Sequence, residues 1–237
     1  MSTTLAIAER ELKAFFASTV AWIIAAAFMA ITGFLFSVIL LNSNEASLRF
    51  LISNLSVVFL FIAPFLTMRL LAEENRLGTV ELLLTNPVRD IEVVLGKFLG
   101  VMGFILVMLA LTLYFPLLLF IFGTPDPGPM VTGYLGVVLQ AAAFAAIGLA
   151  ISSTTENQIV AAFLAFAINL ILWLSESISA FLNKPFSDVA KYLSITSHMQ
   201  DFSRGVIDSS HIIFFLSVVA AALFLTYLSL QSRRWRA

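Results

Sequence analysis

The residues with the most evident binding chemistry lie in one polar stretch, EENRLGTVELLLTNP, at positions 73–87. Gly78 suits the end of one helix, Thr79 suits the cap of a short new helix, and Pro87 would stop that helix. Leucines on both faces of this helix, ringed by carboxylates, favour a protein docking site over the alternative of a solvated loop. The expected docking residues are Glu73, Glu74, Gly78, Thr79, Val80, Glu81, Leu82, Leu83, Leu84 and Pro87.

Motifs for nucleotide binding and hydrolysis are missing from the sequence. It contains no GxxxxGK[ST] loop, so we do not expect this chain to bind ATP itself. It also contains no HExxH, no GxSxG and no cysteine, which removes the simplest hydrolase readings and thiolate metal sites. We expect no metal site, because His198 and His211 are well separated in sequence and no carboxylate pattern accompanies them.

Polar residues inside apolar segments are few, which argues against an ion-driven pump. Asn54, Asn169 and Glu176 are candidates for lining a cavity, and Gln140 is a further intraspan polar group. Hydrogen bonding between helices is the more common role of such residues, and the sequence leaves both readings open.

The amino-acid composition indicates whether these residues belong to a soluble protein or to a membrane protein. The 237 residues have a mean hydropathy of +1.01 and only 11% charged side chains, against about a quarter in soluble domains. Such a chain is predicted to be an all-α protein that crosses a membrane several times. Its formal net charge of −1 gives no indication of nucleic-acid binding.

Six apolar segments are long enough to span a bilayer. We expect a single transmembrane domain over residues 1–237, with an overlong third span that bends at Pro116. Ala142, Ala146 and Ala150 in the fourth span, beside Gly148, predict close helix packing. The expected spans cover residues 18–41, 48–71, 91–122, 134–152, 158–181 and 211–231.

The distribution of Lys and Arg predicts the orientation. Nine of the thirteen basic residues fall on the side that holds both termini and the loop at 72–90, and four fall on the other side. By the positive-inside rule, the termini and that loop are expected in the cytoplasm and residues 182–210 outside. Within the cytoplasmic loop, Asp90 is expected to cap the third span and Lys97 to extend toward the interface.

Two segments differ from ordinary spans or loops. Residues 1–17 form an amphipathic pattern whose polar side holds Glu9, Arg10 and Lys13. This predicts an interfacial elbow helix, which is either a passive anchor or an element that carries motion into the bundle. Residues 182–210 are too polar to span and too apolar for a free loop, so one or two short helices folded against the bundle are expected.

The stretch PFLTMRLLAEENRLGTVELLLTNPVRDIEVVLGKFLG resembles the ABC-2 type permeases, and most closely the branch of the gliding-motility permeases and the copper-processing permease of denitrifiers. RELKAFF near the N-terminus and HMQDFSRGVID before the last span are also similar to the family. The residues that carry the main motif are Pro64, Thr67, Met68, Arg69, Glu73, Glu74, Gly78, Thr79, Glu81, Leu83, Leu84, Pro87, Gly96 and Lys97.

The resemblance implies a type V ABC exporter-like fold in the bacterial cytoplasmic membrane. Two permease subunits, identical or different, would pair, and each would bind a cytoplasmic ATPase subunit that carries the ATP and Mg. Residues 78–85 would be the coupling helix, and a periplasmic auxiliary protein is a further possible partner. Short re-entrant helices would close the outer side, with His198, Asp201, Phe202, Arg204 and Gly205 as gate residues.

Two other functions remain open from the sequence. The same architecture serves a mechanical or scaffolding complex that moves no solute. A membrane enzyme would need a catalytic pair inside the bundle, for which Glu176 and His198 are the candidates. No histidine or methionine array indicates copper as a substrate.

Overall fold

The computed structural model describes residues 3–42, 48–78, 89–123 and 125–234. Within those ranges the chain is helical and contains no strand, which confirms the predicted all-α class. The helices are α1 (Thr3–Ala17), α2 (Thr19–Asn42), α3 (Arg49–Thr67), α4 (Arg69–Leu77), α6 (Asp90–Thr112), α7 (Tyr114–Phe122), α8 (Pro127–Thr154), α9 (Gln158–Ser179), α10 (Phe186–Tyr192), α11 (Ile195–Arg204) and α12 (Ser209–Arg234).

Six helical segments of the described chain are long and apolar enough to cross a membrane, as the sequence predicted. They cover Thr19–Leu41, Arg49–Leu77, Asp90–Phe122, Pro127–Thr154, Gln158–Ser179 and Ser209–Ser232. The fourth begins earlier than expected because Asp126 caps it, accepting a hydrogen bond from Gly128 N at 3.0 Å, and Pro127 suits the first helical position. The second continues past the predicted end at residue 71 and stops at Gly78, whose φ of 67° is favourable for glycine.

The second and third spans are each divided into two helices. Helix α3 ends at Thr67 and α4 begins at Arg69, one turn after Pro64. In the third span the helix breaks at Leu113, because Pro116 cannot donate a hydrogen bond to the carbonyl of Thr112. The bend that Pro116 predicts is therefore present, and each of these spans consists of two helical pieces.

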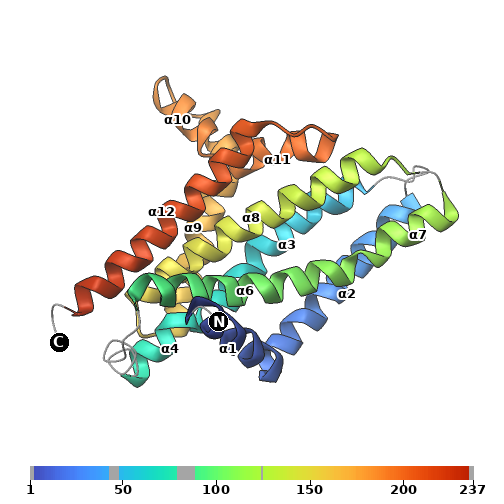
Figure 1. Cartoon of the computed structure of the whole chain (residues 1–237). Coiled ribbons are helices and arrows are strands. Elements are labelled where there is room, and N and C mark those ends of the chain that lie inside the picture. The colour runs from blue at the N-terminus through green and yellow to red at the C-terminus, as the bar shows by residue number, and fades with distance from the viewer. Residues whose placement is uncertain (1–2, 43–47, 79–88, 124, 235–237) are drawn as a thin grey trace.

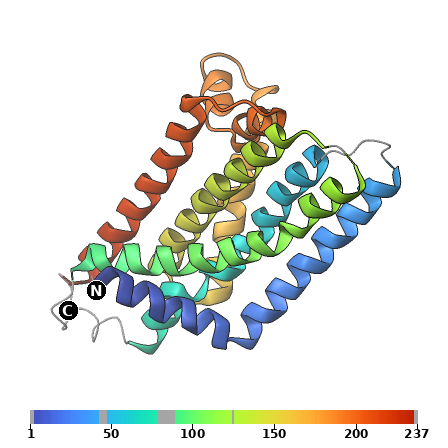
Figure 2. The ribbon, with the colours of Figure 1, turned by 45° about the vertical axis from the view of Figure 1, so that its right-hand side comes forward.

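Helix α8 lies in the interior of the bundle, between α3 and α9 on one side and α12 on the other (Figures 1 and 2). Helix α2 forms one edge of the fan of helices and α12 the opposite edge (Figure 2). The start of α1 and the end of α12 lie at one end of the bundle, where α1 runs alongside the start of α6 (Figure 1). Helices α10 and α11, which we call the cap (Phe186–Arg204), lie at the other end (Figure 1).

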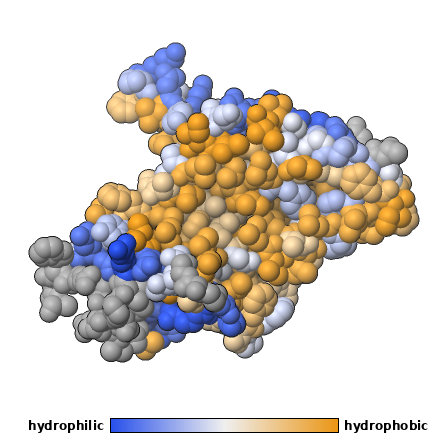
Figure 3. Space-filling model, in the orientation of Figure 1, coloured by the Kyte–Doolittle hydropathy of each residue, from blue (hydrophilic) through white to orange (hydrophobic). Residues whose placement is uncertain are grey.

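Hydrophobic side chains cover the middle of the face seen in Figure 3, and hydrophilic ones gather toward its two ends. The buried core contains mostly apolar side chains, with Phe28, Phe59, Phe144 and Phe215 fully enclosed. This distribution suits a chain whose flanks contact lipid and whose ends contact water. Together with the six apolar helices, it identifies a multi-pass integral membrane protein.

Candidate functional site

Helix α4 contacts α1, α3, α6, α8 and α9 within its nine residues. It directly precedes the segment 79–88, which contains most of the predicted docking residues and lies outside the described residues. The structure therefore describes the base of the predicted coupling segment, and we call α4 with its contacts on α1, α6 and α8 the hub.

A buried charge cluster joins three of these elements. Lys97 Nζ of α6 lies 2.7 Å from Glu74 Oε1 of α4 and 3.1 Å from Glu11 Oε1 of α1, and the lysine side chain is only 1% exposed. Arg10 Nη2 adds a contact of 2.9 Å to Glu11 Oε1. The expectation that Lys97 extends to the interface is wrong, because two carboxylates hold its ammonium group inside the protein.

Glu11 is ionised in this cluster. Burial by itself raises the pKa of its carboxyl, but the charges and hydrogen bonds of Lys97 and Arg10 outweigh that effect and leave the pKa below its ordinary value. Lys97 and Arg10 both lie within 4 Å of the carboxyl groups of Glu11 and Glu74. A buried ion pair contributes little net stability, yet removal of one partner leaves the other charge uncompensated at high cost.

Arg69, at the start of α4, holds the other end of α1. Its guanidinium donates to Ser18 Oγ at 2.8 Å and to the carbonyl of Ala14 at 3.5 Å. The same group lies 4.6 Å from the centre of the Phe15 ring, within the range of a cation–π contact. Helix α4 therefore contacts two parts of the elbow helix α1, namely the middle of α1 and the C-terminal end of α1.

Glycines on α6 form the seat of the elbow. A Cβ atom at Gly96 would lie 2.6 Å from Ile7 Cβ, and one at Gly100 would lie 2.5 Å from Glu11 Cβ. These distances are too short for any side chain, so the spacing of the two glycines lets α1 and α6 approach closely. The elbow is therefore packed into the protein along α6 and does not rest on lipid alone.

The three predicted polar elbow residues have separate roles. Lys13 Nζ and Glu9 Oε1 form the expected i, i+4 pair at 2.6 Å, and both side chains are largely exposed. Arg10 instead points toward the buried cluster through Glu11. Of the predicted docking residues, Glu73 is half-buried, Glu74 faces Lys97, and Gly78 ends α4. The remaining ones, Thr79, Val80, Glu81, Leu82, Leu83, Leu84 and Pro87, lie outside the described residues.

The first turn of α6 also differs from the expectation. Asp90 was predicted to cap the helix, but it is the first helical residue and Arg89 occupies the cap position. The carboxylate of Glu92 closes this end by accepting from Arg89 N at 3.0 Å. Negative charge in the first turn of a helix stabilises the helix, because the N-terminal end carries a partial positive charge. Glu92 therefore adds to the stabilisation that was expected from Asp90.

The cap brings together residues that are distant in sequence. The His198 ring stacks on Phe214 of α12 at 3.9 Å between centroids and lies 4.9 Å from the His211 ring. His211 Nε2 lies 2.7 Å from Asp201 Oδ2, which closes the contact between α11 and α12. In the described chain no group of three metal-ligating side chains gathers here or elsewhere.

Three further predicted gate residues define the other side of the cap. Phe202 is fully buried, and its carbonyl accepts a hydrogen bond from Thr132 Oγ1 of α8 at 2.7 Å. Gly205 ends α11 with a φ of 93° and packs against Pro129. Arg204 is in the last turn of α11, where its charge favours the helix C-terminus.

Acidification should loosen the cap, because burial lowers the pKa of His198 and the nearby His211 acts in the same direction. The unfolded chain then binds protons at a higher pH than the folded chain does, so stability is full above about pH 6.5 and declines below it. Thermal unfolding at pH 7.5 and pH 5.5 should show this loss. His198→Phe, which retains a ring to stack on Phe214, should show a smaller loss, and an equal loss in both proteins would contradict the assignment.

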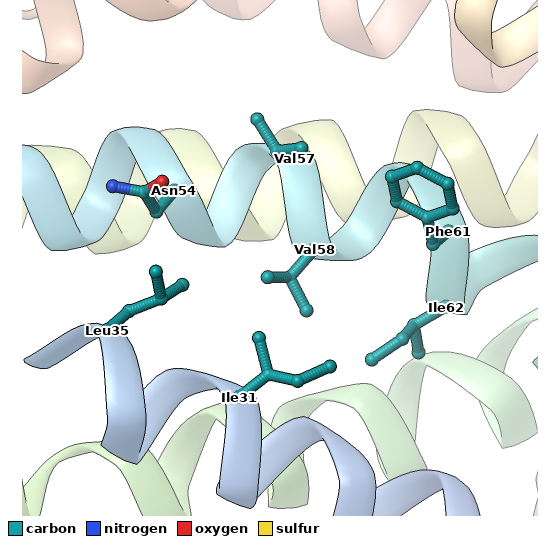
Figure 4. A pocket seen from close by; sticks show the side chains of 7 residues that line it. All are labelled: Ile31, Leu35, Asn54, Val57, Val58, Phe61 and Ile62. Carbon is teal, nitrogen blue, oxygen red and sulfur yellow. The ribbon is translucent and has the colours of Figure 1, made fainter.

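The three predicted cavity residues do not form one site. Asn54 is half-buried and lines a groove of about 320 Å³ between α2 and α3, at the end nearest Leu35 (Figure 4). Asn169 is fully buried in α9, and neither atom of its amide has a hydrogen-bond partner within the described structure. Glu176 lies farther along α9, with Oε1 3.5 Å from Gln200 Nε2 of the cap.

Gln140 has the more ordinary role that intraspan polar residues take. Its amide Oε1 accepts a hydrogen bond from Ser56 Oγ, and its Nε2 donates to the Ser56 carbonyl at 3.3 Å. Both side chains are buried, so they join α3 to α8 in the apolar interior.

Sequence reasoning missed the internal partners in the hub. Glu11 was not singled out, and neither were Asn75 and Ser152, which join α4 to α8. A usable signal for Lys97 was present, because it is flanked by Gly96 and Gly100 near the start of an apolar span. The neighbouring glycines indicate that another helix packs closely against this part of α6, and such a helix can cover the lysine.

Comparison with protein families gives a match to the family described as ABC-2 family transporter protein, over residues 5–234. A search of curated proteins found no match. The family match includes the elbow, the hub, all six candidate spans and the cap. Because it covers nearly the whole chain, the protein belongs to the ABC-2 transporter family and is a permease subunit of an ABC transporter.

Proposed function

We propose that this permease is an exporter subunit driven by a separate cytoplasmic ATPase, which grips residues 78–85 as a coupling helix. The observation that carries the proposal is the hub. A segment that receives force needs a firm base, and α4 has ionic and hydrogen-bonded contacts to α1, α6 and α8 directly before that segment. ATP and Mg belong on the partner in this proposal, in keeping with the missing phosphate-binding loop.

The orientation follows from the basic residues. With nine of thirteen Lys and Arg on the side of the hub, the positive-inside rule puts the hub and both termini in the cytoplasm of a bacterial inner membrane. The cap then faces outward, where α10 and α11 act as the re-entrant gate of a type V exporter. An auxiliary protein outside the membrane would meet this same surface.

A second permease subunit is expected to cover the face formed by α2, α3 and α9. Asn54 is a half-buried amide on that face whose Nδ2 donates to the Phe50 carbonyl at 2.7 Å, and an amide is costly in contact with lipid. A second apolar groove lies beside it between α3 and α9, and Phe61 lines both grooves. Asn54, Asn169 and Glu176 remain candidates for contacting a transported solute, but only Asn54 lines a groove on this face, since Asn169 is fully buried and Glu176 contacts the cap. The narrower kinship with the gliding-motility and copper-processing permeases remains part of the proposal.

Replacement of Leu83 and Leu84 by Asp tests the proposed docking. The substitutions place two charges in an apolar contact, so co-purification with the ATPase encoded beside this gene should fall by at least about tenfold, a cost of about 1.4 kcal/mol. Val189→Asp is the matched control, since Val189 is an exposed apolar residue on the cap. Unchanged association and unchanged ATPase coupling in the double variant would overturn the proposal.

A mechanical complex that moves no solute is the second candidate. It is supported by the same hub, because a motor that pulls on α4 can deform a membrane protein without transport. Reconstitution of the complex in liposomes separates the two functions, since only a transporter should show ATP hydrolysis that is stimulated by a solute. Loss of all solute stimulation across candidate compounds would favour the mechanical role.

A further inference from the structure

The break in the second span is bridged by a hydroxyl from another helix. Ser152 Oγ, near the end of α8, donates to the Met68 carbonyl at 2.9 Å and accepts from Ala72 N at 3.0 Å. Met68 O and Ala72 N are the carbonyl and amide that an uninterrupted helix would join to each other. The hydroxyl also accepts from Leu71 N at 3.1 Å, so one side chain of α8 contacts three backbone groups around the break.

A second contact runs in the reverse direction, from α4 to the end of α8. Asn75 Nδ2 lies 3.0 Å from the Thr155 carbonyl and 3.3 Å from the Ser153 carbonyl. The last carbonyls of a helix have no partner within that helix, and the Asn75 amide supplies one. The ends of α4 and α8 therefore satisfy each other's backbone, and neither can shift without breaking buried hydrogen bonds.

Helix α8 has close contacts along the rest of its length. A Cβ at Gly148 would lie 2.0 Å from Thr67 Oγ1, and one at Gly133 would lie 2.4 Å from Ile52 Cδ1, so α3 and α8 touch at two levels. Gln140 and Ser56 join the same pair of helices between those levels. Because tightly packed interfaces do not deform continuously, α3 and α8 are expected to move together.

The other end of α8 holds the cap. Thr132 Oγ1 lies 2.7 Å from the Phe202 carbonyl in a buried position and 3.0 Å from the Gly128 carbonyl of its own helix, so the shorter contact is the one to the cap. A Cβ at Gly136 would lie 2.8 Å from both Cβ and Cγ of Phe202, so α11 rests directly on the backbone of α8. Twenty residues separate Thr132 from Ser152, which at 1.5 Å per residue places the two contacts about 30 Å apart on one continuous helix.

We propose that α8 is the rod that carries movement of α4 to the cap, and that Ser152 and Thr132 are the positioning residues at its two ends. The inference rests on the proposed function, because the movement originates when the ATPase pulls on the segment after α4. It assigns a route through the fourth span, distinct from the path through the elbow that the sequence suggested. Motion reaches the cap because each contact along the route is short, buried and directional.

A single introduced cysteine reports on the cap, since the chain has none of its own. Val206→Cys places a thiol at an exposed position directly after α11. In the complex with its co-purified ATPase, labelling by a membrane-impermeant maleimide should change by at least about fivefold between the nucleotide-free state and the state trapped with ATP and vanadate.

Ser152→Ala and Thr132→Val should each reduce this change to less than about twofold while ATP hydrolysis continues. Ser175→Ala and Thr226→Val are the matched controls, because those buried hydroxyls donate to carbonyls of their own helices. Thr132→Ser, which keeps the hydroxyl, should restore the response. An undiminished response in Ser152→Ala and Thr132→Val would overturn the inference, as would the absence of any response in the parent complex while it hydrolyses ATP.

A measurement on the chain alone separates this inference from the proposed function. In the purified permease, Ser152→Ala should speed hydrogen–deuterium exchange in residues 195–204 by at least about threefold relative to Ser175→Ala, although Ser152 lies at the other end of α8. Exchange that rises in α4 but not in the cap would overturn the route through α8. Failure of any ATPase to bind would refute the proposed function alone.

Discussion

Replacing Lys97 with methionine should destabilise the folded permease by about 3–5 kcal/mol, because Glu11 and Glu74 would then share a buried site without the ammonium group that both contact. For a chain of this length, that loss corresponds to a fall of about 6–20 °C in the melting temperature. Thermal unfolding of the purified protein in detergent measures it directly. The same variant should uncouple ATP hydrolysis in the complex, since the base of the coupling segment would be free to move.

Two companion variants show whether charge or packing is responsible. Lys13→Met removes a lysine from the exposed pair with Glu9, and should change stability by no more than about 1 kcal/mol. Lys97→Met combined with Glu11→Gln and Glu74→Gln should regain most of the lost stability, because no uncompensated carboxylate remains. If the single and triple variants melt alike, the methylenes of Lys97 and not its charge explain the loss.

Among glycine-to-alanine substitutions in the bundle, Gly148→Ala should lower the stability of the fold most. The added Cβ would lie 2.0 Å from Thr67 Oγ1 and 2.9 Å from Thr67 Cβ. The threonine cannot swing away freely, because its hydroxyl donates to the Ala63 carbonyl at 2.9 Å. The helices α3 and α8 must separate instead, at a cost of about 3 kcal/mol, which unfolding in detergent would detect.

Gly33 provides the matched control for this substitution. A Cβ there would have Tyr114 Oη as its nearest neighbour at 3.8 Å, an ordinary contact distance. Gly33→Ala should therefore be neutral or stabilise the protein by up to about 1 kcal/mol through helix propensity. Adding Thr67→Ala to Gly148→Ala should recover part of the loss. A Gly148→Ala protein as stable as the parent would show that α3 and α8 are not held at the described separation.

Much of the fold could be read from the sequence, because each span is a local property of some twenty consecutive residues. Apolar length alone gave six spans, and Pro116 alone indicated the break in the third. The end of the second span was harder to predict from the sequence. Charged residues after position 71 suggested a loop, whereas Glu74 is neutralised by Lys97, a residue that the sequence places in another span.

The hub could be predicted only in part, for a related reason. The motif that includes Arg69 and Glu74 marked the correct segment, and Gly78 marked its end. The partners Glu11 and Ser152 come from segments far away in the chain, and a single sequence does not report such contacts. Nothing in the neighbouring sequence marks either residue as a contact residue. A serine near the end of a helix and a glutamate on an amphipathic helix are both common.

The cap shows the same division between local and distant information. Its two short helices follow from a composition intermediate between span and loop. The pairing of His198 with His211 and Phe214 depends on α12 returning beside α11. The separation of the two histidines in the sequence was taken as a poor basis for a metal site, and it concealed the contact between their rings, whose centroids lie 4.9 Å apart.

The position of Lys97 also has a consequence for how the chain enters its membrane. Spans are delivered in the order of synthesis, and a lone lysine in an apolar helix disfavours insertion by about 2.5–3.5 kcal/mol at the centre of the bilayer. Glu11 and Glu74 both come before Lys97 in the chain, so both counter-ions are synthesised before the lysine that they contact. Every counter-ion that the described structure places against the Lys97 ammonium group therefore precedes the lysine in the order of synthesis.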